Sequence, residues 1–515
     1  MDFSAFKTPG RYRVCVDGIG CSYPFSIAED AWAQAFRLSM KGLLHQRSGI
    51  ALGPPFTDYV RPRNMHPADG AKVYASAAGE IEGGGQDGLF RMLAARRTDR
   101  LLPDAWGGHM DAGDWDRNTA HPAAMWNLLD LYELFPERIG AIKLALPPAE
   151  SGNAIPDVLD EVLWNLDLYR RLQAPDGGVG GGIESTAHPR PGEASWQESL
   201  FLSAYAPDPR ASLVYAATAA KLSRALDASD RTLAGVYAAS ARKAWEWAVA
   251  HSAECLAQMD EKARRPVADD LRDARNLAAF ELWRRTGEAA FHDEFRATTL
   301  LAVEGGEVLR QRKAVVSYAR LPDGQGDADL RATARKWLVK AADDSLAFAD
   351  GNALGITLCV PQLPPMGFIG YFATPETSVG PVLPYAWLLT HEEKYLAGAV
   401  RACQFAAGAN PDNRALTTGL GPDPVRFPLH IDSLVTGQPA PAGITVYGIS
   451  DPAENYGFDG WAHTWFLQKM VPGSRTWPAA ESYWDIWVVP STNEFTIHQT
   501  IIPTAFYWGF LAARP

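Results

Sequence analysis

The sequence predicts a mainly α-helical chain that closes into a ring of helical hairpins. Helical segments from about residue 29 onward come in pairs with short polar turns between them, without the fixed short period of a regular repeat. Two acidic motifs, Asp111–Asp114 and Asn493–Glu494, lie 494 − 114 = 380 residues apart. A closed toroid makes such distant segments neighbours, whereas the alternative, an open solenoid, keeps them apart.

The first 28 residues are predicted to form short strands instead of helices. Arg11–Val16 alternates in polarity, Asp17–Gly20 supplies turn residues, and Ser22–Ile27 is again extended in character. Two or three strands cannot build an independent core. We therefore expect residues 1–28 to be the tail of a β-sandwich or an arm on the helical body, which would span residues 29–515.

The helices are predicted from the spacing of apolar residues. Ala31–Leu44 has helical spacing, and Pro156–Gln173 carries one apolar stripe with a proline in its first turn and Pro175 beyond its end. Later helices are expected in pairs at 213–226 with 233–250, 276–285 with 289–295, and 385–389 with 395–407. The stretches 45–110, 173–195, 350–382 and 410–459 are expected to be loops, where sites are built on a helical scaffold.

Composition excludes several classes of function. The net charge of −12 argues against a nucleic-acid partner, which needs a basic surface. No stretch is long and apolar enough to cross a membrane, and the N-terminus lacks the basic and apolar regions of a signal peptide. An odd number of cysteines, without a Cys-x-x-Cys pair, argues against a disulfide scaffold and a zinc site. Most of the five are expected to be buried small hydrophobes: Cys15, Cys21, Cys255, Cys359 and Cys403.

The first acidic motif places two carboxylates on one tight turn. Asp111 and Asp114 flank Ala112-Gly113, and such small residues allow a substrate to approach. Two carboxylates so placed can hold a water molecule between them and remove its proton. Asp residues in such a string more often close an Asx-turn or cap a helix, so the motif alone does not establish a site.

The second motif places Glu494 in an apolar, β-branched context that continues to Leu511, with Pro503 as an expected break. An acid at the head of an apolar helix has its pKa raised by desolvation, as a general acid requires. The alternative is a first-turn Glu that stabilises the helix dipole. Two carboxylates that face each other across a cleft are what glycoside hydrolysis requires, so the pair predicts a sugar-cleaving enzyme.

Other candidates are weaker. Gly177–Gly182 lacks the spacing and the lysine of a phosphate-binding loop. His430 lies in a Pro-containing segment and could bind sugar hydroxyls or serve a structural role. Glu184 and Glu198 are more often solvated charges than catalysts. The chain has no Gly-x-Ser-x-Gly motif, which weakens a serine-hydrolase interpretation.

Taken in order, the motifs resemble glycoside hydrolase family 9, the inverting cellulase family with an (α/α)6 barrel. The resemblance implies a barrel over residues 29–515 and makes residues 1–28 the remnant of an immunoglobulin-like domain. It rests on Pro9–Tyr12, Gln46–Gly49, Gly107–Asp114, Asn410-Pro411, Thr418–Gly421 and Asn493-Glu494.

This resemblance also assigns roles to the acids. Asp114 would be the general base, Asp111 its partner in holding the attacking water, and Glu494 the acid that protonates the leaving oxygen. The residues expected to bind substrate are Trp115, His430, Asp432 and Tyr456. The expected partner is an oligo- or polysaccharide, with neither nucleic acid nor membrane, and the expected location is secreted or periplasmic, with the cytoplasm as the alternative.

Three departures from the family pattern bear on substrate and metal. The His-His-Arg stretch that grips the sugar corresponds to Leu429–Asp432, where one His remains and a carboxylate lies nearby. Residues 488–492 replace the acidic residues common before the catalytic Asn-Glu. An Asp in place of an Arg would suit a cationic amino sugar, so an exo-β-glucosaminidase acting on chitosan oligosaccharides is the alternative to a cellulose-type β-glucanase, and a catalytically silent carbohydrate-binding protein is a further one. Ser48 stands where many relatives have a zinc-binding Cys, so zinc is not expected; no cofactor is required, and a structural calcium is compatible with the family.

Overall fold

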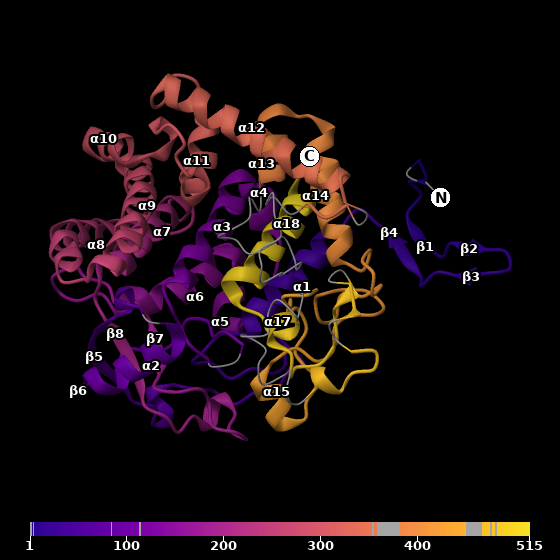
Figure 1. Ribbon diagram of the computed structural model, residues 1–515, viewed down its shortest axis with the longest axis horizontal. Coiled ribbons are helices and arrows are strands. Elements are labelled where there is room, and N and C mark those ends of the chain that lie inside the picture. Colours follow the sequence, from indigo (N-terminus) through magenta and orange to yellow (C-terminus); the bar gives the residue numbers. More distant parts are fainter. Residues whose placement is uncertain are drawn as a thin grey trace.

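Helices from the two ends of the chain pack together and close the helical body (Figure 1). In this computed structural model, α1 (Ala31–His45) packs against α18 (Ile502–Ala513), and α18 also packs against α3 (Ala120–Leu134). Trp32 stacks on Trp508 with ring centroids 5.6 Å apart. This contact confirms the predicted closed ring and excludes an open solenoid. The structure describes residues 3, 5–83, 85–112, 115–352, 355–357, 382–449, 466–473, 476–478 and 481–514.

The remaining helices pack as neighbours along the chain. Thus α7 packs against α8 and α9, α9 against α10, and α11 through α14 each against the next. Their bounds are α4 Pro136–Ala141, α5 Pro148–Ser151, α6 Asp157–Arg171, α7 Pro209–Ala225, α8 Arg231–Ala257, α9 Glu261–Thr286, α10 Ala289–Thr298, α11 Arg312–Ala319, α12 Ala328–Asp350, α13 Val382–Thr390, α14 Glu393–Ala406, α15 Ile431–Thr436 and α17 Pro490–Asn493. Short 3-10 helices lie at Pro67–Asp69, Glu80–Glu82, Ser195–Gln197, Leu300–Ala302, Val308–Gln311 and Leu467–Lys469.

Helices with a clear apolar stripe begin and end close to their predicted bounds, and α6 shows why. Asp157 and Asp160 lie in its first turn and Arg170 and Arg171 in its last, which complements the helix dipole at both ends. Its apolar stripe is buried in the core. The predicted span 156–173 differs from the observed one by one residue at the start and two at the end.

Two kinds of helix were not predicted from spacing. Helix α9 begins at Glu261, 276 − 261 = 15 residues before the predicted start, because its first half is polar and half-exposed and carries no stripe. Helix α3 lies inside the ring and is buried on nearly all sides, so it has no polar face to define a period. The sequence prediction also omitted α11 and α12.

A small sheet lies where loops were predicted, which corrects the interpretation of residues 45–110 and 173–195. Strands β5 (Val73–Gly79) and β8 (Leu202–Ala206) pair in parallel, and β6 (Arg97–Leu101) and β7 (Ile183–Ser185) flank them antiparallel, in the order β6-β5-β8-β7. Helix α2 (Gly85–Arg96) joins β5 to β6. A short apolar run cannot be assigned to a strand or a loop by period alone.

The sheet holds the backbone that follows the first acidic motif. Arg117 forms an isolated antiparallel bridge with Ile183, and its amide donates to the Ile183 carbonyl at 2.9 Å. A β-carbon on Gly182 would lie 1.9 Å from the Arg117 carbonyl oxygen. The glycine-rich loop is therefore a close-packing element that positions residues 115–118.

The N-terminal segment forms an arm that projects from the helical body (Figure 1). Strand β1 (Gly10–Tyr12) pairs with β4 (Phe25–Ile27), and β2 (Cys15–Val16) pairs with β3 (Gly20–Cys21), all antiparallel. Cys15 and Cys21 form a disulfide across the exposed β2–β3 pair, so the expectation of buried small hydrophobes is wrong for both. Cys403 is buried and Cys255 half-buried, as free thiols, while Cys359 lies outside the described residues. No helix in the described ranges is long and apolar enough to cross a membrane.

Candidate active site

The two acidic motifs meet inside the ring. The amide of Ile497 donates a hydrogen bond to Asp111 Oδ1 at 2.8 Å, across 386 residues of sequence. Ile497 lies three residues beyond Glu494. The predicted proximity of these segments is therefore confirmed by a direct contact.

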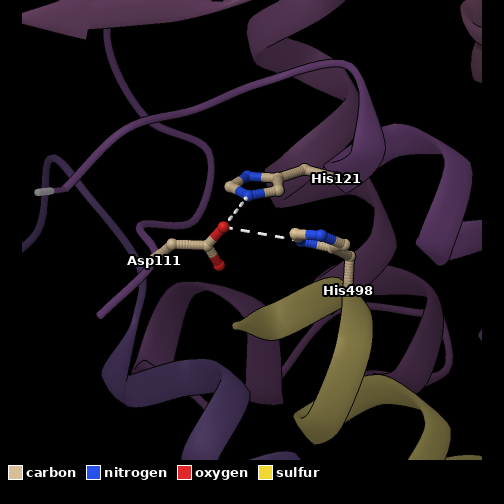
Figure 2. A group of neighbouring side chains, drawn as sticks. All are labelled: Asp111, His121 and His498. Atoms are coloured by element: carbon tan, nitrogen blue, oxygen red, sulfur yellow. Dashed lines mark hydrogen bonds and ion pairs between the residues drawn. The ribbon is translucent and has the colours of Figure 1, made fainter. Parts of the chain in front are cut away.

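Two histidines face the other oxygen of the same carboxylate (Figure 2). His121, in the first turn of α3, has Nε2 2.9 Å from Asp111 Oδ2, and His498, on the π-helical turn Ile497–Ile501, has Nδ1 3.4 Å from it. We call Asp111, His121 and His498 the Asp111 cluster. Asp111 is 5% exposed and His121 is fully buried.

The cluster keeps its carboxylate ionised. Burial opposes ionisation of Asp111, but the charge on His121 and the contacts with both imidazoles outweigh it, and the pKa of Asp111 lies well below its usual range. Burial likewise lowers the pKa of His121, yet the charge of Asp111 and its hydrogen bond raise that pKa overall. A buried, ionised carboxylate with fixed orientation is suited to hold a polar reactant such as water.

Neither histidine was predicted from the sequence. No pair of His residues forms a recognisable ligand motif, and His121 and His498 lie 377 residues apart. The available signal was weak: His121 follows Asp111 by ten residues and His498 follows Glu494 by four. Only the ring closure brings them together.

Glu494 lies at the end of a short helix and not at the head of a long one, which corrects the prediction. It follows α17, has extended backbone, and its carbonyl oxygen accepts a hydrogen bond from the Tyr447 amide at 2.8 Å. The apolar helix α18 begins only at Ile502, with Pro503 in its first turn. Glu494 is half-buried.

The residue after the predicted base adopts a strained backbone conformation. Trp115 has φ +57°, in the left-handed region that a bulky residue rarely occupies. It is 3% exposed, and its carbonyl accepts a hydrogen bond from Arg117 Nη1 at 2.8 Å. Such strain persists where surrounding contacts enforce it, and it is common at active sites. The predicted base Asp114 and the predicted substrate-binding residue Tyr456 lie outside the described residues.

His430 lies against the segment that carries Glu494. Its ring stacks on Phe495 with centroids 6.1 Å apart, and its Nδ1 caps α15 by accepting from the Ser433 amide at 3.2 Å. With Nδ1 as the acceptor, Nε2 carries the proton. Burial lowers the pKa of His430 to about 4, although Asp432 opposes this shift.

Asp432 has partners from the protein itself. Its Oδ1 accepts from the Ser195 amide at 2.6 Å, and its Oδ2 accepts from the Ser195 hydroxyl at 2.7 Å. Arg61 Nη1 lies 4.0 Å from Oδ2, and both side chains are almost fully buried. The negative charge at this position is thus compensated internally.

A cavity of about 370 Å³ borders the Asp111 cluster through His498. It opens at the N-terminal ends of α3, α7 and α11 and is also lined by α9. Thr119 and Arg210 are among its lining residues. The cavity gives small molecules a route to the cluster.

Comparison with known proteins identifies the family. The model of glycosyl hydrolase family 9 matches residues 32–501. A xyloglucan-specific endo-β-1,4-glucanase of Bacteroides ovatus is 25% identical over 494 residues, covering 88% of this chain and 79% of that protein. A cellulose 1,4-β-cellobiosidase of Acetivibrio thermocellus is 25% identical over 567 residues, covering 97% of this chain but only 59% of that longer protein.

Solved structures agree in fold. A metagenome-derived family 9 endoglucanase superposes with a TM-score of 0.78 at 24% identity, covering 100% of this chain and 86% of that one. The termite endoglucanase of Nasutitermes takasagoensis superposes at 0.61 with 15% identity, covering 94% of this chain and 98% of that one. The chain belongs to glycosyl hydrolase family 9 and is a glycoside hydrolase on an (α/α)6 barrel.

Proposed function

We propose that this chain hydrolyses β-1,4-glucosidic bonds of cellulose-type β-glucans with inversion at the anomeric carbon. The proposal is supported by the family match and by relatives named as β-1,4-glucanases and as a cellobiosidase. The single observation that carries it is the contact between Asp111 and the segment of Glu494. Inversion needs acid and base about 6.5–9.5 Å apart, on opposite sides of the bond.

In this mechanism the three acids have separate roles. Asp114 removes a proton from the attacking water, and Glu494 protonates the leaving glycosidic oxygen. Asp111 holds the water, because its oxygens, oriented by Ile497 and His121, each retain a further lone pair to accept a hydrogen bond. Its low pKa supports this role, since a protonated carboxyl would lose acceptor capacity.

The contacts of Asp432 favour a neutral glucan over an amino sugar. The case for a glucosaminidase rests on an uncompensated carboxylate beside the sugar. Ser195 and Arg61 instead occupy this carboxylate, and it is 2% exposed. Electrostatic attraction for a cationic sugar therefore loses its source at this position.

Parallel assays on cello-oligosaccharides and chitosan oligosaccharides, with the product anomer followed by NMR, test the proposal. We expect α-anomer as the first product, from the cello-oligosaccharide. A β-anomer would contradict inversion, and turnover of chitosan oligosaccharides alone would contradict the glucan assignment.

Two amide variants test the assigned roles. Asp114→Asn and Glu494→Gln are each expected to lower kcat by about 10²–10⁴-fold, the usual contribution of a positioned acid or base. The matched controls Asp99→Asn and Glu137→Gln change exposed acids and should leave kcat unchanged. Unchanged background turnover in both active-site variants would instead favour a catalytically silent carbohydrate-binding protein.

We also infer an oxidising location, outside the cytoplasm. The exposed Cys15–Cys21 disulfide supports it, because such bonds persist mainly in secreted and periplasmic proteins. Detection of the chain in the extracellular or periplasmic fraction of its own cells would agree with this inference. Recovery from the cytosol alone, with both thiols reduced, would contradict it.

A further inference from the structure

One group of side chains has the composition of a transition-metal site. Asp111, His121 and His498 each present one carboxylate oxygen or imidazole nitrogen, and these three atoms lie within 4.8 Å of one another. Figure 2 shows both rings turned toward the same carboxylate. Within the described part of the chain, no other three His, Cys, Asp or Glu side chains converge in this way.

The spacing within the cluster is close to what one ion requires. Asp111 Oδ2 lies 2.9 Å from His121 Nε2 and 3.4 Å from His498 Nδ1. Zinc binds such atoms at about 2.0–2.2 Å, so neighbouring ligand atoms of a tetrahedral site lie about 3.3–3.5 Å apart. Small side-chain movements would bring all three atoms to one ion without moving the backbone.

One ligand atom of the cluster lacks a hydrogen bond. Nδ1 of His498 is buried and forms none, although Asp111 lies 3.4 Å away. A buried polar atom without a partner is rare in proteins and calls for an explanation, such as an ion. The amide of Ile497 meanwhile holds Asp111 Oδ1, and this type of contact orients a metal-binding carboxylate.

Charge and access also suit a cation. The carboxylates of Asp116 and Glu80 act on His121 in addition to Asp111, so negative groups outnumber positive ones around this imidazole. His498 lines the cavity of about 370 Å³, which provides an entry path and room for a water molecule as a further ligand.

We propose that Asp111, His121 and His498 bind one divalent transition-metal ion through one carboxylate oxygen and two imidazole nitrogens. Imidazole ligands favour Zn²⁺ or Co²⁺, whereas Ca²⁺ and Mg²⁺ require oxygen ligands. The site is separate from the zinc position that the family resemblance places at Ser48. Binding does not depend on the proposed hydrolysis; if Asp111 holds the attacking water, a bound ion takes up one of its oxygens and slows turnover.

Calorimetric titration of the full chain with ZnCl2, after chelator treatment and without sugar, tests the proposal. We expect one ion per chain and no saturable binding of CaCl2 or MgCl2. His498→Gln, which removes the partly exposed ligand, should weaken Zn²⁺ binding at least about tenfold. The matched control His251→Gln changes a histidine outside the cluster and should leave binding unchanged.

A second measurement covers the buried ligand, whose substitution is harder on the fold. His121→Asn is used only after circular dichroism shows native helix content, and Co²⁺ absorption then reports coordination directly. We expect tetrahedral Co²⁺ bands in the wild-type chain and their loss in His498→Gln. Absence of saturable Zn²⁺ binding, or wild-type affinity in His498→Gln, would overturn the proposal. Neither result bears on glycoside hydrolysis, which is assayed separately with chelator present.

Discussion

The two ends of α3 carry buried charges of opposite character. Near its start, His121 belongs to the Asp111 cluster, which borders a cavity and contains an imidazole nitrogen without a hydrogen bond. Near its end, about 14 Å further along the helix axis, Asp130 belongs to a charge network between helices. The network consists of Asp130, Glu133, Lys221, Arg224, Glu281 and Arg320.

Charges in the network are matched, whereas those in the cluster are not. Three cations face three carboxylates, with Lys221 Nζ 2.9 Å from Asp130, Arg224 2.5 Å from Glu281, and Arg320 2.8 Å from Asp130. Tyr385 also donates to Asp130, at 2.6 Å. A matched network stabilises the packing of helices from distant parts of the chain. An unmatched cluster beside a cavity is left to interact with something that enters.

The largest effect is expected at the matched end. Lys221→Met should lower the free energy of unfolding by about 3–5 kcal/mol, because it leaves the carboxylates of Asp130 and Glu133 buried without their cation. Urea unfolding measures the loss. The fraction that stays folded should retain wild-type kcat; a matching fall in kcat would show that the network also serves the site and would remove the contrast between the two ends.

At the unmatched end the expected effect is on catalysis. Asp111→Asn should lower kcat by about 10²-fold, or about 2.7 kcal/mol, because an amide accepts hydrogen bonds from a water less strongly than a carboxylate. Its free energy of unfolding should change less than that of Lys221→Met. Steady-state kinetics on cello-oligosaccharides, with urea unfolding in parallel, separate the two effects. Wild-type kcat in a folded Asp111→Asn variant would contradict the role of Asp111.

A third buried carboxylate sharpens the comparison, because it is unmatched but lies away from the site. Burial raises the pKa of Asp160 to about 7, with Glu150 adding to the shift and a hydrogen bond from Asn153 opposing it. The unfolded chain releases this proton near pH 4 and the folded chain near 7, so stability falls as pH rises through that window and stays lower above it.

Asp160→Asn should therefore stabilise the chain above pH 7 by about 1–3 kcal/mol and change little at pH 4. Thermal unfolding at both pH values, together with kcat, measures this. Equal stabilisation at both pH values would contradict a titrating origin. A fall in kcat would show that Asp160, too, serves the site.

The smallest effect is expected on the surface. Lys340 and Asp344 form an exposed i,i+4 pair on α12, where water screens the charges. Lys340→Ala should change the free energy of unfolding by less than about 0.5 kcal/mol. A loss comparable to that of Lys221→Met would mean that burial does not distinguish the two lysines.

Sequence spacing predicted elements with one buried and one exposed face, and it missed the others. Helices α1, α6 and α8 have such faces and were predicted, whereas α3, buried on nearly all sides, and the polar first half of α9 were not. Strands β5 and β8 were interpreted as loops for a related reason, because they are too short to establish a period. The disulfide between Cys15 and Cys21 was missed because pairing depends on the hairpin that brings the two thiols together.

The sequence alone determined the helical hairpins, the closed ring and the acidic motifs that the ring brings together, because periodic burial and motif order are local or ordered along the chain. Tertiary structure decided which groups share each carboxylate. Asp432 and Asp111 were both predicted as site residues, yet Ser195 and Arg61 compensate one, while His121 and His498 surround the other. These partners come from segments up to 387 residues away, and such distances in space are set by ring closure and helix packing, which no local pattern records.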